Sequence, residues 1–115
     1  MVSKRKILIV PDKFKGSLSA SKVADAIEEA IRMRIVHISD MEIEKVPMAD
    51  GGDGSLDIMY TALSRENSSE ATLIEVECCD PLRRPLTAPM LLFCSGGELC
   101  AFIEMARCCG LTLLK

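Results

Sequence analysis

The sequence contains few aromatic residues and almost no histidine. Phe, Tyr and Trp together make up 3% of the 115 residues, Trp is missing, and His37 is the only histidine. The core must therefore consist of aliphatic side chains, and a hydrophobic content of 49% is typical of a globular protein. His37 lies in an apolar stretch, so we expect it to pack at a strand edge and not to act as a general base.

Long basic runs and long apolar runs are also missing. The net charge is −3, and no basic run is longer than Lys4-Arg5-Lys6, so we expect no nucleic-acid partner. The apolar run 7–10 ends at Pro11, which makes it too short for a signal peptide or a membrane span. We therefore expect a cytoplasmic protein that has no membrane partner.

The six cysteines lack the C-x-x-C spacing of a zinc or redox site. Without a signal peptide, reduced thiols are favoured over the disulfide framework of a small secreted protein. Neighbouring cysteines point in different directions on a strand or a helix, which disfavours a shared metal ion. The six are Cys78, Cys79, Cys94, Cys100, Cys108 and Cys109.

Hydrophobic periodicity predicts strand, helix, strand, helix in the first 70 residues. Residues 6–10 predict a short strand, since 7–10 are all apolar, which is typical of a strand buried on both faces of a parallel sheet. A helix should follow, with Ser19 or Ser21 as its N-cap. Residues 42–46 predict the second strand, and the apolar stripe in 56–63 predicts the second helix. This order indicates parallel strands with right-handed crossovers, a Rossmann-like α/β segment.

After residue 70 the pattern becomes antiparallel. Apolar and charged residues alternate in 74–78, which predicts a half-exposed strand. Residues 86–94 and 98–104 predict two strands of a hairpin, joined through Ser95-Gly96-Gly97. We therefore expect residues 1–70 to belong to the Rossmann-like domain and residues 71–115 to start a second, more antiparallel α/β domain.

Two polar loops follow the carboxyl ends of the two predicted parallel strands, the edge at which open α/β sheets bind ligands. Glycines allow an anion to approach the backbone, and the following helix presents free N–H groups, so this pattern predicts a phosphate site. The first loop provides Asp12, Lys13, Lys15, Gly16 and Ser17. The second provides Asp50, Gly51, Gly52, Asp53, Gly54 and Ser55.

Asp50 and Asp53 need a role beside a phosphate, because a carboxylate repels it. One carboxylate can accept a proton from an attacking hydroxyl, and one can hold a divalent cation. The loop matches neither a P-loop nor a dinucleotide-binding fingerprint. The alternative is a tight turn in which either aspartate only caps the helix, with Lys13 and Lys15 as solvated surface charges.

Two further residues are ambiguous from the sequence alone. Phe14 is expected to fill the core and not to stack on a ligand. Glu104 lies between Ile103 and Met105 in an apolar stretch. A carboxylate there needs a partner, so it is either a paired structural residue or a member of the site.

Four segments together resemble the signature segments of the bacterial-type glycerate kinases, in the same order and at about the same spacing. They are VPDKFKGSLSA at 10–20, VPMADGGDGS at 46–55, DPLRRP at 80–85, and FIEMA at 102–106 with Gly110 and Leu111. The resemblance extends over nearly the whole chain.

The resemblance implies a kinase that uses ATP and Mg²⁺ to phosphorylate D-glycerate, usually to 2-phosphoglycerate. It implies two α/β domains with the site in the cleft between them. By the same resemblance, the cleft is lined by Lys15, Ser17, Asp50, Gly51, Gly52 and Gly54, and Glu104 falls on the family's I-E-M position. From charge logic we expect Asp50 and Lys15 to be catalytic and Asp53 to hold the metal. The remaining loop residues and Glu104 are expected to bind substrate or phosphate.

The sequence also departs from the family's pattern. Asp53 and Ser55 replace the commoner Glu and Thr, which keeps the charge and the hydroxyl. Arg83 and the two cysteine pairs replace small or apolar residues. Family members are several times longer, so we expect an N-terminal piece that is inactive alone. A non-catalytic α/β module that binds a phosphorylated metabolite is the alternative, and a cysteine-rich metal-binding protein is the least favoured.

Overall fold

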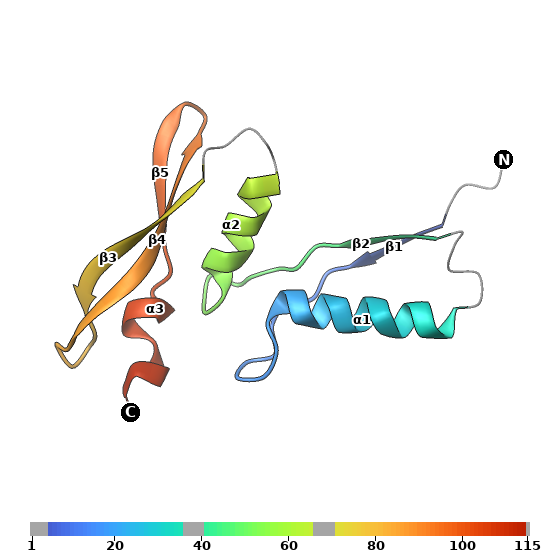
Figure 1. Ribbon diagram of the computed structural model, residues 1–115, viewed down its shortest axis with the longest axis horizontal. Helices are drawn as coiled ribbons and strands as arrows, with labels where there is room; N and C mark the ends of the chain where they lie inside the picture. Colours follow the sequence, from blue (N-terminus) through green and yellow to red (C-terminus); the bar gives the residue numbers. More distant parts are fainter. Residues whose placement is uncertain (1–4, 36–40, 66–70, 115) are drawn as a thin grey trace. The chain divides into compact units, whose positions relative to one another are not determined.

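The computed structural model describes residues 5–35, 41–65 and 71–114. The chain divides into two compact units, residues 1–50 and 51–115. Figure 1 labels the elements of both units. The domain boundary expected near residue 70 stays a prediction, and His37 lies outside the described residues.

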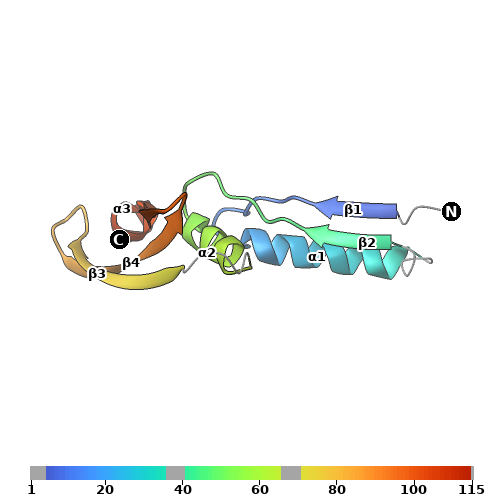
Figure 2. The same ribbon diagram turned by 90° about the horizontal axis from the view of Figure 1, so that it is seen from above.

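The first unit is a parallel strand pair with one helix. Strand β1 (Arg5–Ile9) pairs with β2 (Met41–Lys45), and helix α1 (Ala20–Arg34) connects them and runs alongside the pair (Figures 1 and 2). The N-cap is Ser19, whose hydroxyl accepts a hydrogen bond from the Lys22 N–H at 3.4 Å. The predicted strand, helix, strand order and the parallel pairing are confirmed.

The expectation that the first strand is buried on both faces is wrong in the described structure. Ile9 is buried together with Ala20, Val23 and Ala24 of α1, whereas Leu8 is 57% exposed. The reason is that side chains of a strand alternate between two faces, and α1 packs against this two-stranded sheet on the side of Ile9.

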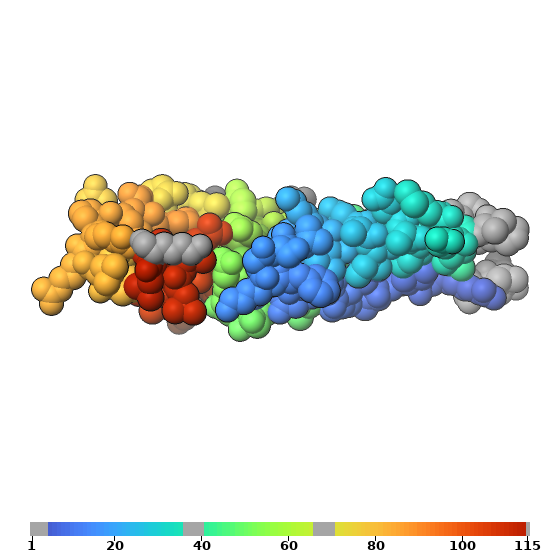
Figure 3. All heavy atoms as spheres, turned by 90° about the horizontal axis from the view of Figure 1, so that it is seen from below, coloured from blue at the N-terminus to red at the C-terminus, as the bar shows by residue number. Residues whose placement is uncertain are grey.

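The second unit contains helix α2 (Ser55–Arg65) and an antiparallel sheet in the order β3-β4-β5. The strands are β3 (Thr72–Cys79), β4 (Pro85–Ser95) and β5 (Glu98–Ile103), followed by α3 (Ala106–Cys109) and the 3₁₀ helix η2 (Leu111–Leu114). Both α2 and α3 contact the central strand β4. The red atoms of the C-terminal segment lie beside the orange atoms of the hairpin in Figure 3.

The core of the second unit lies on β4 and the first turn of α2. Leu56 of α2 and Leu91 of β4 are almost completely buried, and Ala88 of β4 is buried as well. The hairpin turn uses Gly96 and Gly97, both with positive φ, as the sequence predicted. The α/β fold class, with a parallel segment followed by an antiparallel one, is therefore confirmed. Among the described residues, no helix is both long enough and apolar enough to cross a membrane.

Candidate functional site

The ends of the two parallel strands bring charged residues together in the first unit. Beyond the strand pair, the N–H of Met48 donates to the carbonyl of Pro11 at 2.8 Å, so the two segments continue side by side. The Lys13 ammonium then donates to Asp50 Oδ1 at 2.9 Å and lies 3.8 Å from Asp12 Oδ1. The sequence predicted that these loops meet at one edge of the sheet, and Asp12, Lys13 and Asp50 do meet there.

The Lys13–Asp50 pair is only partly exposed to solvent. The Lys13 side chain is 18% exposed, whereas that of Asp50 is 62% exposed. Lys13 is therefore not the fully solvated charge of the alternative interpretation. Because ion pairs near the surface contribute about 0.2–1 kcal/mol to folding, this pair matters little for stability. Its geometry leaves a carboxylate that solvent can reach beside an ammonium group.

The remaining residues of the first loop form a small closed turn. Phe14 and Leu18 exchange backbone hydrogen bonds in both directions, at 2.9 and 3.1 Å, and Gly16 has a φ of 74° at the tip. Lys15 and Ser17 are exposed, and Lys15 makes no hydrogen bond or ion pair within the described residues. Phe14 is 63% exposed, so the expectation that it fills the core is wrong. The tight turn holds its ring at the surface instead.

The glycine-rich segment leads directly into α2 in the second unit. Gly51 and Gly54 have φ values of 90° and 88°, which side chains with a Cβ rarely adopt. A Cβ built at either position meets no atom within 4 Å, so the backbone conformation and not crowding requires glycine there. The Ser55 N–H donates to the Gly52 carbonyl at 3.1 Å. Asp53 is exposed and, in the part of the chain that the structure describes, its side chain makes no hydrogen bond or ion pair.

Glu104 is buried and bonded to the same segment. Its side chain has no exposed surface. Oε1 accepts from the Gly54 N–H at 3.1 Å, and Oε2 accepts from the Leu56 N–H at 2.8 Å. Arg107 Nε also donates to Oε1 at 3.1 Å. Glu104 therefore has the partner that the sequence required, and whether it also belongs to the site stays a prediction. Glu104, and not Asp53, caps the amino end of α2.

Arg107 extends this network to the surface of α2. Its Nη2 atom lies 2.9 Å from Asp57 Oδ2, while its Nε atom holds Glu104. Sequence reasoning missed both Arg107 and Asp57, because fifty residues separate the pair and no motif links them. Ser55 is buried as well, and its hydroxyl has no hydrogen-bond partner among the described residues.

A second buried carboxylate, Asp80, organises the turn between β3 and β4. Its Oδ1 atom accepts the N–H groups of Leu82 at 2.8 Å and Arg84 at 2.9 Å. Its Oδ2 atom accepts from Arg84 Nε at 2.5 Å. Burial alone would raise the pKa of Asp80. The bonds from the Arg84 backbone, the Arg84 guanidinium and the Leu82 backbone outweigh burial and hold the pKa below its ordinary value.

All six cysteines are free. Burial is the main cause that raises the pKa of the Cys78 thiol, and the neighbouring Cys108 and Cys79 add to it. The pKa of Cys109 is raised by its hydrogen bond with Cys108, whose Sγ lies 4.0 Å away. Both thiols are therefore protonated at neutral pH. Within the described residues, no three His, Cys, Asp or Glu side chains are arranged to hold a metal ion.

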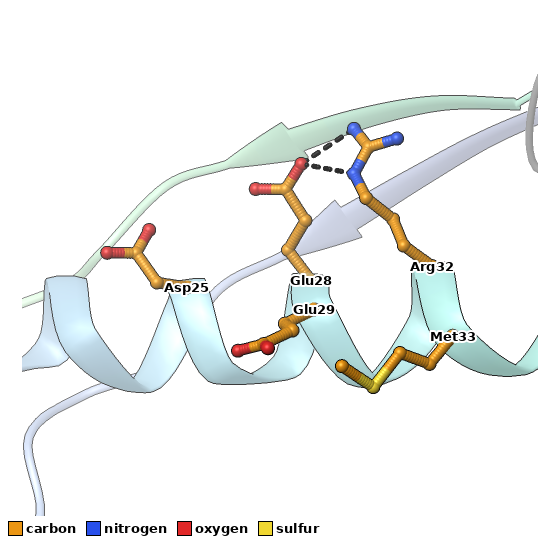
Figure 4. A pocket seen from close by; sticks show the side chains of 5 residues that line it. All are labelled: Asp25, Glu28, Glu29, Arg32 and Met33. Carbon is orange, nitrogen blue, oxygen red and sulfur yellow. Dashed lines mark hydrogen bonds and ion pairs between the residues drawn. The ribbon is translucent and has the colours of Figure 1, made fainter.

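A surface hollow on α1 is no competing site. Figure 4 shows its lining residues, which all come from one helix: Asp25, Glu28, Glu29, Arg32 and Met33. Two of the carboxylates, on Asp25 and Glu28, each lie 2.7 Å from the Lys45 ammonium. The hydrogen bond from Lys45 is the largest cause that lowers the pKa of Glu28. Because Lys45 pairs with Asp25 and Glu28, and Arg32 pairs with Glu28, two of the three carboxylates of the hollow already have cationic partners.

The structure thus forms two groups from the predicted site residues. Asp12, Lys13 and Asp50 lie together in the first unit, with Lys15, Gly16 and Ser17 in the adjacent turn. Gly51, Gly52, Asp53, Gly54 and Ser55 form the glycine-rich segment of the second unit, with Glu104 behind it. Their roles in binding or catalysis stay predictions.

Comparison with known proteins agrees with the motifs. The model of the glycerate kinase family matches residues 7–115. The chain is 39% identical over 110 residues to the glycerate 2-kinase of Escherichia coli K12, and 39% identical over 109 residues to the glycerate kinase of Haemophilus influenzae. It is 36% identical over 109 residues to the glycerate kinase of Bacillus subtilis 168. No solved structure gives a significant match.

Each of these three alignments covers 95% of this chain and 26% of the relative. The match runs through both loops, the turn at Asp80 and the Glu104 segment. The chain belongs to the glycerate kinase family. It spans about a quarter of the length of the curated relatives that it matches.

Proposed function

We propose that the whole protein is an ATP-dependent glycerate kinase that converts D-glycerate to phosphoglycerate. The observation that carries this proposal is the family match over residues 7–115, which includes both polar loops. The name of the Escherichia coli relative, glycerate 2-kinase, supports 2-phosphoglycerate as the product. We place the activity in the cytoplasm, and the 115 residues alone are expected to be inactive.

Asp50 is the proposed general base of this reaction. Its exposed carboxylate would accept the proton of the glycerate hydroxyl while that oxygen attacks the γ-phosphorus of ATP and ADP leaves. The Lys13 ammonium at 2.9 Å supports this role, because it holds the orientation of Asp50 Oδ1. Lys15, at the tip of the exposed turn, would neutralise charge on the transferred phosphoryl group. Asp12, Gly16 and Ser17 would line the same site.

The glycine-rich segment would bind phosphate through the backbone of Gly51 and Gly52. The N–H groups of Gly54 and Ser55 already donate to Glu104 Oε1 and to the Gly52 carbonyl, so these two residues would shape the segment. Asp53 would hold Mg²⁺. In this role Asp53 would supply a carboxylate ligand to a kinase Mg²⁺ site. Such a site needs one or two carboxylates, with water and substrate phosphates as the other ligands. The exposed and uncommitted Asp53 fits this requirement. Mg²⁺ would neutralise charge on the phosphates.

Phosphorus NMR of a reaction with the full-length protein tests the proposed function. D-glycerate, ATP and Mg²⁺ should give ADP and the resonance of 2-phosphoglycerate, and chelation of Mg²⁺ should abolish turnover. A 3-phosphoglycerate resonance would correct the product. No turnover, together with tight calorimetric binding of a phosphorylated metabolite, would instead support the non-catalytic binding module.

A further inference from the structure

Glu104 is the most strongly buried charged side chain on the described part of the chain, and its cost requires an explanation. A carboxylate removed from water is expensive unless several hydrogen bonds compensate it. Glu104 receives three, from the Gly54 N–H, the Leu56 N–H and Arg107 Nε. Two of these three donors belong to the backbone of the glycine-rich segment and the first turn of α2.

The position of these donors shows what the carboxylate fixes. Gly54 has a φ of 88°, so its N–H direction depends on a backbone conformation that few residues adopt. Leu56 is buried in the first turn of α2. An anion at this helix end is also favoured by the helix dipole. The Glu104 carboxylate therefore fixes the junction between the segment 51–55 and α2. Its two backbone donors lie 50 and 48 residues earlier in the sequence.

The same arrangement argues against direct contact between Glu104 and a substrate. Its side chain has no exposed surface, and both carboxylate oxygens already accept hydrogen bonds. A second anion at the Gly54 and Leu56 N–H groups would meet the Glu104 charge. Asp53, by contrast, lies one residue before Gly54 and is exposed.

We propose that Glu104 is a positioning residue of this kinase site: it fixes the glycine-rich segment 51–55 through the Gly54 and Leu56 N–H groups and so determines where Asp53 and the backbone of Gly51 and Gly52 meet the nucleotide phosphates. This inference rests on the proposed function. Arg107 completes the device, since it holds Glu104 through Nε and α2 through Asp57. Misplacement of a binding segment by about 1 Å can cost as much as 10²-fold in rate.

The test compares Glu104→Gln with Asp80→Asn in the full-length protein. Asp80 is a matched control, because it is also a buried carboxylate of the second unit that accepts two backbone N–H groups and an arginine. Both substitutions should lower the melting temperature. Glu104→Gln should also lower kcat/KM at least tenfold and raise KM for ATP, measured well below the melting temperature, and Asp80→Asn should leave both unchanged.

Hydrogen exchange gives a second readout that needs no activity. In Glu104→Gln, amides of the peptide that contains residues 51–57 should exchange faster than in wild type. Faster exchange with unchanged kinetics would reduce Glu104 to a helix cap and overturn the proposal. If Glu104→Gln does not fold, Arg107→Gln decides instead: reduced kcat/KM supports positioning, and unchanged kcat/KM overturns it. An inactive wild-type protein would overturn the proposed function itself before any variant is compared.

Discussion

The two units place their carboxylates differently. In the first unit, Asp50 is 62% exposed and its lysine partner comes from a neighbouring loop. In the second unit, the side chains of Glu104 and Asp80 are 0% and 4% exposed, and each accepts two backbone N–H groups and an arginine. An exposed carboxylate can exchange protons and ligands, whereas a fully bonded one can only hold its donors in place.

This difference separates carboxylates that fix the backbone from carboxylates that are available for a reaction. Desolvation makes the buried carboxylates costly, so they persist only where several donors surround them. Glu104 and Asp80 each shape a loop whose backbone contains a residue with positive φ, at Gly54 and Arg83 respectively. Asp50 and Asp53 are exposed instead, which suits them to catalysis and metal binding in the proposed function.

The largest effect is expected from Asp50→Asn, which removes the exposed carboxylate that is proposed to act in the reaction. In the full-length protein, loss of the proposed general base should lower kcat by about 10²- to 10⁴-fold. The melting temperature should hardly change, because a pair near the surface contributes little to folding. Steady-state kinetics with D-glycerate and thermal unfolding measure the two effects.

Asp25→Asn is the matched control for that experiment. Asp25 is 65% exposed and lies 2.7 Å from the Lys45 ammonium, so it reproduces the exposure and the lysine partner of Asp50 on a different element. Its turnover should equal that of wild type. Near-normal turnover of Asp50→Asn would remove Asp50 from the chemistry and leave it as one more surface ion pair.

Acid should remove the stability that the ionised Asp80 gives to the turn between β3 and β4. Because its folded-state pKa lies below the ordinary value of 3.8, the ionised form stabilises the fold. This stabilisation is fully present above about pH 4 and is lost as the pH falls through the folded-state pKa. Asp80→Asn should therefore speed hydrogen exchange in the 80–84 turn relative to wild type at pH 7, and the rate ratio should approach one in strong acid.

Comparison at equal pH removes the intrinsic pH dependence of exchange. Glu75→Gln, at an exposed position on β3, serves as the control and should give a ratio near one at every pH. If the ratio for Asp80→Asn stayed high and constant down to strong acid, the charge of Asp80 would contribute nothing, and the turn would depend on shape alone.

Local sequence signals predicted most of the elements correctly. Ser19 as a helix cap, the parallel pairing of the first two strands and the hairpin at Gly96-Gly97 each follow from short-range rules. The meeting of Asp12, Lys13 and Asp50 followed from a topological rule, since parallel strands end at the same edge. These features depend on neighbours in sequence or on the order of elements.

The contacts of Glu104 could not be predicted in the same way. An apolar context indicated that it needs a partner, but its donors lie 48 and 50 residues earlier. No local sequence pattern marked Arg107 or Asp80 as a member of a buried ion pair, because burial depends on how the whole chain packs. The prediction for Phe14 was wrong for the opposite reason: hydrophobicity predicted a core residue, and a closed five-residue turn holds it at the surface.

The smallest expected effect concerns the backbone of the turn that the buried Asp80 supports. Arg83 has a φ of 61° and is the one non-glycine residue with positive φ among the described residues. It stands where the resemblance implies a small or apolar residue. The left-handed conformation costs about 1–2 kcal/mol for a residue with a Cβ. Arg83→Gly should therefore stabilise the turn by up to about 1 kcal/mol, after the entropy of glycine in the unfolded chain is subtracted.

Arg83→Ala separates conformation from charge, because it removes the guanidinium but keeps the Cβ. Only Arg83→Gly should slow hydrogen exchange in the 80–84 turn and raise the urea midpoint of the full-length protein. Equal gains from both variants would assign the effect to the arginine charge. No gain from either would mean that Asp80, through its bonds to the Leu82 and Arg84 N–H groups, already compensates the strained residue between them.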